Sequence, residues 1–134
     1  YRYTHDVKYL EQAEKIYGFI FNNKNLPEYL VPYWDFDAPK IPDEPRDASA
    51  AACTASALYE LSTYIPGKGY KEKADKIMES LASPAYRAEV GTNGNFILMH
   101  SVGSIPHGAE IDVPLNYADY YFLEALMRKR DLEK

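Results

Sequence analysis

Polar side chains that could contact a ligand gather in the short segment from His100 to Ser104. His100 could bind a carboxylate or carry a proton, because imidazole changes its charge near neutral pH. Ser101 and Ser104 lie three residues apart and could donate hydrogen bonds to ligand oxygens. His107 is a second candidate of the same kind, and for both histidines the alternative is a ring that bonds to loop backbone. The sequence places no base beside either serine, so this segment does not indicate a serine hydrolase.

A second candidate segment runs from Trp34 to Asp47 and mixes aromatic with acidic side chains. Trp34 could offer its flat ring to a ligand, or the aromatic rings could pack the loop onto the protein. In the second interpretation Arg46 pairs with a carboxylate and Asp47 caps the helix that follows. The acidic spacing does not match an EF-hand loop, and the single cysteine, Cys53, excludes a Cys-based zinc site. We therefore expect neither a metal nor another cofactor.

Helices must position these two segments, and the apolar spacing predicts four of them. The expected ranges are 6–22, 48–62, 70–82 and 117–130. The first and third have one apolar face, which is typical of an outer helix. The second has small residues on every face and the fourth has large apolar residues around almost its whole circumference, so we expect both to be buried on all sides. The expected capping residues are Thr4 or Asp6, Asp47 and Asn116.

Two long connections separate these helices. Five of the nine prolines lie within residues 23–46, which excludes a regular helix there. Residues 84–115 are rich in glycine and proline and are expected to be mainly loop, with the run Phe96–Met99 as a short strand or buried turn. Outer and inner helices therefore alternate twice, and both long connections lead into an inner helix. The pattern predicts an all-α fold of stacked helical hairpins.

Composition narrows the classes of partner. The chain has 134 residues with 15 basic and 20 acidic side chains, and it shows no basic stripe of the kind that binds nucleic acid. No apolar run approaches the roughly 20 residues that span a membrane. Tyr1 opens the chain without an initiator Met, so we expect the 134 residues to be part of a longer unit. Two hairpins cannot surround two inner helices, so we expect further hairpins or self-association through exposed inner helices.

Five segments together carry a resemblance to a known family. The segments are Tyr1–Thr4, Val31–Asp37, Pro42–Ala50, His100–Ser104 and Asn116–Leu126. They resemble motifs of the bacterial unsaturated glucuronyl hydrolases, which form glycoside hydrolase family 88. The resemblance covers nearly the whole chain but only about the last third of a family member. It implies that residues 1–134 are the C-terminal portion of an (α/α)6 barrel catalytic domain, with about two of its helical hairpins.

The resemblance also implies an activity. Family members hydrate the C4=C5 double bond of a Δ4,5-unsaturated uronic acid at the non-reducing end of oligosaccharides that polysaccharide lyases release. An aspartate serves as general acid and base, and neither a metal nor a nucleotide takes part. The family's two catalytic aspartates would lie upstream of Tyr1, so no catalytic residue is expected here and the chain alone is expected to be inactive. The compartment, bacterial cytoplasm or periplasm, stays open.

Alternatives remain beside this interpretation. The related unsaturated rhamnogalacturonyl hydrolases share the barrel and the double-bond chemistry. A non-catalytic, self-associating helical module is a candidate from a different class. The partner that the family resemblance implies is an unsaturated oligosaccharide, such as a disaccharide derived from a glycosaminoglycan.

The resemblance implies sugar contacts by the segment that begins at His100. Ser101 and Ser104 resemble family serines that contact sulfate, and a lysine often follows two positions later, where this chain has Pro106. Trp34 or Tyr33 is the candidate stacking platform for a sugar, and Tyr120 could donate to a sugar hydroxyl or lie in the core. The predicted substrate-binding residues are His100, Ser101, Gly103, Ser104, Trp34 and Tyr120.

Overall fold

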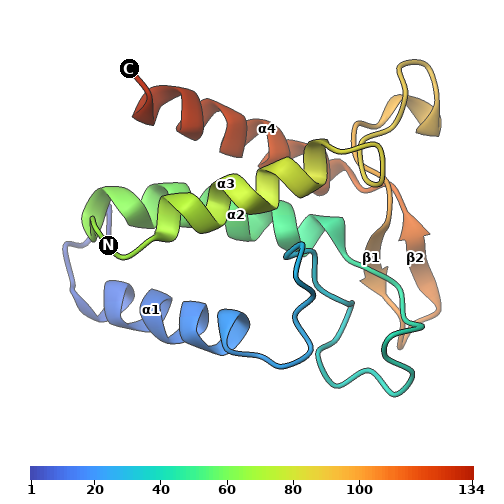
Figure 1. Ribbon diagram of the computed structural model, residues 1–134, viewed down its shortest axis with the longest axis horizontal. Helices are drawn as coiled ribbons and strands as arrows, with labels where there is room; N and C mark the ends of the chain where they lie inside the picture. Colours follow the sequence, from blue (N-terminus) through green and yellow to red (C-terminus); the bar gives the residue numbers. More distant parts are fainter.

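The computed structural model describes all residues from 1 to 134, and four helices dominate it (Figure 1). They are α1 (Lys8–Phe21), α2 (Ala48–Tyr64), α3 (Tyr70–Ala82) and α4 (Asn116–Leu132). All four predicted helices are present, with ends within two residues of the predicted ones. A short 3-10 turn, η1 (Asn93–Asn95), and two strands, β1 (Ser101–Ser104) and β2 (Ala109–Val113), lie between α3 and α4.

The centre of the fold is α2, which packs against both α3 and α4. Small side chains on α2, among them Ala52 and Ala55, are fully buried and allow the neighbouring backbones to approach closely. From α3, Ile77 and Leu81 fill the space that these alanines leave. The α3 face that carries them is the one that the apolar spacing predicts, so α3 is an outer helix as expected.

An ion-pair cluster fastens α3 to α4 at the edge of this core. The Asp75 carboxylate lies 2.8 Å from both Lys71 Nζ and Lys129 Nζ. The buried Tyr59 donates its hydroxyl to the same carboxylate at 2.8 Å. Burial acts to raise the pKa of Asp75, but the hydrogen bonds from Lys129, Lys71 and Tyr59 outweigh it and lower the pKa to about 2. Asp75 therefore stays charged at every ordinary pH.

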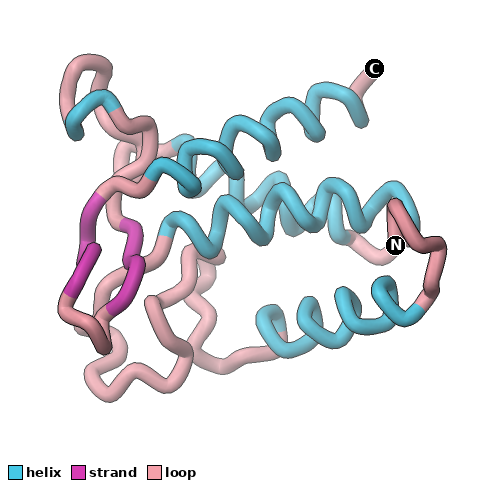
Figure 2. Tube along the Cα trace, turned by 180° about the vertical axis from the view of Figure 1, so that it is seen from behind, coloured by secondary structure: helices cyan, strands magenta, loops and turns pink.

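The second inner helix is much less covered than the sequence predicts. Along α4 only Ala118, Phe122 and Ala125 are buried. The exposed large side chains of α4 are Tyr117, Tyr120, Leu123, Leu126, Met127 and Leu132. The expectation of burial on all sides is wrong for both inner helices. α4 has α2 along one flank and no helix along the other (Figures 1 and 2). α2 leaves Cys53 and Ala57 exposed.

An apolar groove of about 520 Å³ separates α1 from α2. Figure 2 places α1 on the side of α2 that faces away from α4. No residue of α1 is fully buried, and Ile16 and Phe19 are at least half exposed, at 50% and 66%. Both flanks of the α2–α4 pair thus present apolar surface, which matches the expectation that two hairpins cannot enclose two inner helices.

The capping predictions have mixed outcomes. Asp47 caps α2 as predicted, with its Oδ1 accepting a hydrogen bond from Ser49 N at 3.0 Å. Asp6 accepts from Lys8 N at 3.0 Å, although Val7 occupies the capping position of α1. The prediction for Asn116 is wrong, because the helix begins one residue earlier than expected and leaves Asn116 inside its first turn without a capping bond.

The second long connection contains an antiparallel β-hairpin that the sequence analysis missed. Ser101 pairs with Val113, and Val102 pairs with Ile111, so Asp112 is an extra residue that forms a bulge. In the run 96–99 only Leu98 is buried, and the run lies antiparallel to residues 86–88. Ala88 N donates to the Ile97 carbonyl at 2.9 Å and Met99 N donates to the Tyr86 carbonyl at 2.8 Å. The run is thus an isolated bridge, which is closer to the short strand than to the buried turn that the sequence left open.

Candidate functional site

The candidate site is the end of the helical layer where the β-hairpin meets the N-terminus of α2 (Figure 1). Ala48 N, in the first turn of α2, donates to the His100 carbonyl at 2.9 Å. Asp47 Oδ1, besides capping α2, accepts from Val102 N at 3.3 Å. One carboxylate oxygen therefore holds strand β1 against the helix that it caps. Both long connections thus lie at the N-termini of α2 and α4, as the sequence predicts.

Asp119, in the first turn of α4, fixes the chain just before the hairpin. Its two carboxylate oxygens accept from Ile97 N at 2.8 Å and from Leu98 N at 2.9 Å. Two backbone donors of the run 96–99 are satisfied in this way. These bonds join the run to the start of α4, two residues before His100.

Within the hairpin, two histidines make short polar contacts. His100 Nδ1 lies 2.7 Å from Asp112 Oδ1 on the opposite strand. The edge of the His100 ring also meets the Tyr86 ring, with centroids 6.1 Å apart. His107 Nδ1 lies 2.6 Å from the Ser104 hydroxyl across the turn. Both histidines bond to side chains, which differs from the backbone-bonded alternative.

The remaining hairpin residues differ sharply in exposure. Ser101 is fully buried and its hydroxyl has no hydrogen-bond partner. Gly103 is exposed and lies against Glu110 of β2. An unpartnered buried hydroxyl is costly, so Ser101 is the residue in this hairpin with an unmet need for a partner. His100, Ser101, Gly103 and Ser104 thus lie together on one small element.

Trp34 belongs to a separate, internally bonded loop. Its indole Nε1 donates to Glu44 Oε2 at 2.9 Å, and its backbone N donates to the Pro45 carbonyl at 3.0 Å. Arg46 does not pair with a carboxylate, which corrects the sequence-based expectation. Its guanidinium lies 3.6 Å from the centre of the Tyr33 ring, and its Nη1 is buried without a partner.

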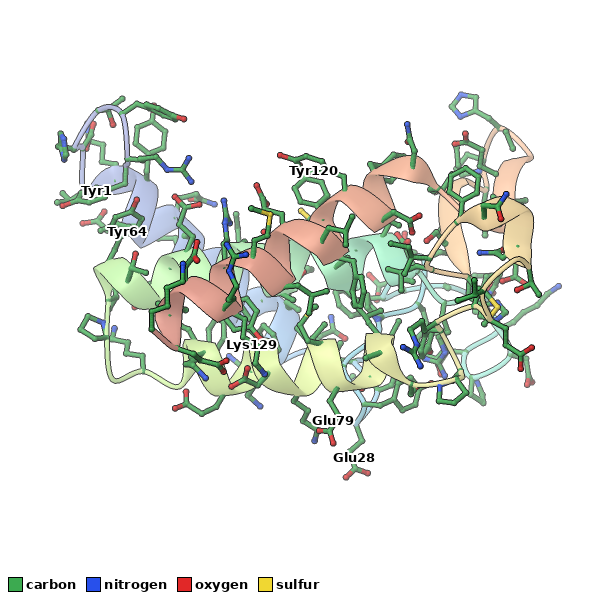
Figure 3. All side chains as sticks on the ribbon, turned by 90° about the horizontal axis from the view of Figure 1, so that it is seen from above. Tyr1, Glu28, Tyr64, Glu79, Tyr120 and Lys129 are labelled. Carbon is green, nitrogen blue, oxygen red and sulfur yellow. The ribbon has the colours of Figure 1, made fainter.

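Tyr120 is not a core residue, since 60% of its surface is exposed. Figure 3 shows its ring projecting from α4 on the side away from α3. Its hydroxyl lies 3.4 Å from Glu124 Oε1, one turn along the helix. The structure therefore groups Tyr120 with the polar side chains between α2 and α4 rather than with the hairpin.

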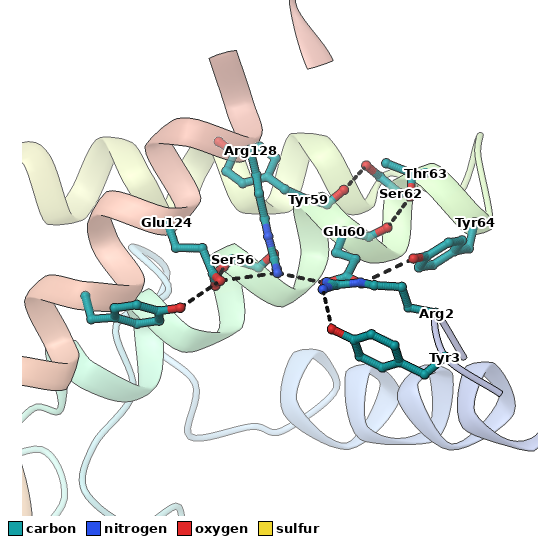
Figure 4. A network of polar contacts seen from close by, with 11 residues as sticks. Arg2, Tyr3, Ser56, Tyr59, Glu60, Ser62, Thr63, Tyr64, Glu124 and Arg128 are labelled. Atoms are coloured by element: carbon teal, nitrogen blue, oxygen red, sulfur yellow. Dashed lines mark hydrogen bonds and ion pairs between the residues drawn. The ribbon is translucent and has the colours of Figure 1, made fainter. Parts of the chain in front are cut away.

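Those polar side chains form a connected network of opposite charges (Figure 4). Arg128 bonds to Glu60 at 2.8 Å and lies 3.4 Å from Glu124 on its own helix. Arg2 forms a second ion pair with Glu60, and Ser56 donates to Glu124. Burial acts to raise the pKa of Glu60, but its bonds with Arg2 and Arg128 lower it overall. The network ties the N-terminal segment, α2 and α4 together by charge.

Sequence reasoning missed Tyr117, which lies beside the hairpin, and Glu110, which lies within it. Tyr117, in the first turn of α4, has a raised pKa because of burial and of the nearby carboxylates of Glu110 and Asp47. The side chains of Tyr117, Glu110 and Asp47 therefore lie near one another, at the N-termini of α2 and α4. The signal in the sequence is the alternation of apolar and acidic residues over 109–113, which is typical of a strand that has Glu110 on one face. No group of three or more His, Cys, Asp or Glu side chains in this chain is arranged to hold a metal ion.

No helix is both long and apolar enough to cross a membrane.

No protein-family profile matches the chain. Curated proteins do match it. An unsaturated glucuronyl hydrolase of Formosa agariphila is 53% identical over 132 residues, which are 98% of this chain and 33% of that protein. An unsaturated chondroitin disaccharide hydrolase of Streptococcus agalactiae is 30% identical, over 96% of this chain and 33% of that protein.

Solved structures agree with these matches. An unsaturated glucuronyl hydrolase described as specific for heparin superposes with a TM-score of 0.94 at 49% identity, over 97% of this chain and 35% of that one. This chain is homologous to a part of the unsaturated glucuronyl hydrolases. A mutant Streptococcus agalactiae hydrolase in complex with dGlcA-GalNAc6S also matches, with a TM-score of 0.76 at 29% identity, over 93% of this chain and 36% of that one.

The comparisons confirm the predicted fold class. These hydrolases have an (α/α)6 barrel, and the four helices of this chain superpose on a part of it. The chain spans about a third of the length of the curated relatives that it matches. The open flanks of the α2–α4 pair are what a part of such a barrel presents to its neighbouring hairpins.

Proposed function

We propose that this chain forms the C-terminal portion of the (α/α)6 catalytic domain of an unsaturated glucuronyl hydrolase, with about two of its helical hairpins. The protein that contains it hydrates the Δ4,5 double bond of an unsaturated uronic acid at the non-reducing end of oligosaccharides that lyases release. The identity of 53% over 98% of the chain to a hydrolase of that name carries this proposal.

We further propose that the hairpin forms one wall of the sugar site. His100 is held in place by Asp112 and can donate or accept at its second ring nitrogen. Ser104 and the exposed Gly103 backbone offer further polar contacts, and the unpartnered hydroxyl of Ser101 lies directly beneath. Trp34 and Tyr120 then act as outer contacts of the sugar chain, from the first long connection and from α4.

Hydrolysis of an unsaturated disaccharide tests the proposal, because loss of the conjugated double bond lowers far-UV absorbance. The full-length product of the gene that carries this chain should turn over the disaccharide. The isolated 134-residue chain should show no turnover, since the family resemblance implies that both catalytic aspartates lie upstream of Tyr1. Robust turnover by the isolated chain would show that the catalytic residues lie within residues 1–134, contrary to this proposal. An inactive full-length product would refute the proposed activity.

The apolar surfaces support a second proposal, that the isolated chain associates with itself. The groove between α1 and α2 leaves apolar surface uncovered, and so do Leu123 and Met127 on α4; such surface favours association. Sedimentation of the isolated chain should then show oligomers. A well-behaved monomer across the concentration range would contradict this proposal and leave the first one intact.

A further inference from the structure

The first five residues have the geometry of the last turn of a helix. His5 N donates to the Tyr1 carbonyl at 2.8 Å, and a bond from residue i to residue i−4 is the bond of an α-helix. His5 itself adopts a φ of 55°, in the left-handed region where many helices end. The rings of Tyr1 and His5 meet edge to face with centroids 5.7 Å apart, and a contact between these two positions accompanies this kind of helix end.

This turn is fixed to the C-terminal end of α2. The Tyr1 ring meets the Tyr64 ring edge to face, with centroids 5.1 Å apart. Arg2 Nε donates to Glu60 at 2.9 Å, and Glu60 bonds in turn to Arg128 (Figure 4). A cation in this position also suits the C-terminal end of a helix dipole. An aromatic contact and an ion pair therefore hold residues 1–4 beside α2.

The apolar groove between α1 and α2 begins at this turn. Tyr1 and Tyr64 line one end of it, and Cys53 lies about three turns further along α2, towards the hairpin. Cys53 and Ala57 are small, exposed and four residues apart, so they leave room for another helix to approach α2 closely. Ile16, which is half exposed on α1, lines the opposite wall.

We propose that this groove receives a helix formed by the residues encoded directly upstream of Tyr1, with residues 1–4 as its last turn. The helix runs parallel to α2, because its last turn lies at the C-terminal end of α2 and the groove extends from there towards the N-terminal end. About 11 further residues reach Cys53 at 1.5 Å per residue. A second copy of the chain in the groove would not account for the helix end at residues 1–5.

The length that this helix needs is present in the relatives, since the chain spans about a third of them. The inference rests on the proposed placement of the chain in the C-terminal portion of a longer protein. It does not rest on the proposed activity, and its test uses no sugar.

Disulfide mapping in the full-length gene product tests the placement. Each residue from about 8 to 14 positions before Tyr1 is replaced in turn by cysteine, beside the natural Cys53. Mild oxidation is followed by peptide mass spectrometry, because a disulfide forms only where the two Cβ atoms come within about 4 Å. Tyr1 lies against Tyr64, so a parallel helix brings the residue about 11 positions before Tyr1 opposite Cys53.

Bonds to Cys53 are expected at two or three positions that lie three or four residues apart, centred about 11 positions before Tyr1. Their yield should exceed that of the positions between them by about tenfold, since those face away from α2. The matched control combines Glu79→Cys with Cys53→Ser. Glu79 is exposed on α3, on the side away from α4 (Figure 3), and a thiol there should form no bond with the same set of positions.

Three results would overturn the proposal. The first is no bond to Cys53 at any position, and the second is an equal yield at every position, which a fixed helix cannot give. The third is bonds between two copies of the protein, which would show that a second copy fills the groove. Because several positions are tested, one variant that fails to fold leaves the others to decide. A full-length product that forms the expected bonds but hydrolyses no unsaturated disaccharide would refute the proposed activity alone.

Discussion

The two long connections of this chain differ in what anchors them to the helices. Residues 22–47, between α1 and α2, bond largely to themselves, as when Asn25 Nδ2 donates to the Phe36 carbonyl at 2.6 Å and Trp34 donates to Glu44. Residues 83–115, between α3 and α4, also bond to one another through the hairpin, but Asp47 and Asp119 hold them from outside as well. Their hairpin leaves the Ser101 hydroxyl and the Glu110 carboxylate without partners.

Each connection contains one buried polar atom without a hydrogen-bond partner, Arg46 Nη1 in the first and the Ser101 hydroxyl in the second. The Arg46 guanidinium also lies on the Tyr33 ring, whereas a bound partner would satisfy the Ser101 hydroxyl. The hairpin is therefore the stronger candidate for sugar contact, and Trp34 is the weaker one. Substitutions that remove the hydrogen bonds holding each connection test this difference between the two connections.

The largest effect is expected at Asp119, the external support of the second connection. Asp119→Ala should lower the free energy of unfolding by about 3 kcal/mol, because it leaves the backbone N–H groups of Ile97 and Leu98 without acceptors. Asp119→Asn keeps one acceptor and should cost less. Urea denaturation of the purified protein measures both. Equal losses of stability for the two variants would contradict the hydrogen bond assigned to the oxygen that Asp119→Asn retains.

A smaller loss is expected at Asp47, which joins the two connections. Asp47→Ala should cost about 2 kcal/mol, since it removes the cap of α2 together with the bond to Val102 N. Asp47→Ser keeps a capping acceptor and should recover much of the loss. Thermal or urea unfolding provides the measurement, and no recovery in Asp47→Ser would show that capping is not the main contribution.

Glu44 tests the first connection in isolation. Glu44→Ala removes the acceptor of Trp34 Nε1 and of Lys40 N and should cost about 1.5 kcal/mol. Sugar turnover should change less than stability, because this loop closes on itself. Tryptophan fluorescence follows the loop directly, since Trp34 is the single tryptophan. A large loss of turnover with unchanged stability would indicate that Trp34 contacts the sugar.

The smallest effect is expected at Asp75, away from both connections. Its pKa of about 2 lies below its unfolded value, so its contribution is present above pH 4 and is lost as pH falls towards 2. Because the carboxylate is 31% exposed, solvent screening limits this contribution to about 1 kcal/mol. Asp75→Asn should reduce the fall in stability between pH 5 and pH 2.5. An unchanged pH profile would contradict the assignment.

The sequence predicted the helices well because their apolar spacing is a local property. The Asp47 cap followed from the same kind of local rule. The hairpin escaped prediction although β2 alternates apolar and acidic residues, because the glycines and prolines around it favoured a loop. Glu110 and Asp112 both adopt φ of 54°, which is unusual for residues other than glycine. The stacking of Arg46 on Tyr33 and the exposure of α4 depend on neighbours that spacing cannot reveal.

The double role of Asp47 has a consequence for the order of folding. The carboxylate binds Ser49 N, two residues away, and Val102 N, which is 55 residues away. The local bond forms with the first turn of α2, but the distant one requires closure of a long loop, which is slow because of its entropy cost. Pulse-labelling hydrogen exchange should therefore find the Ser49 amide protected before the Val102 amide. The hairpin then docks late, onto a helix that is already capped.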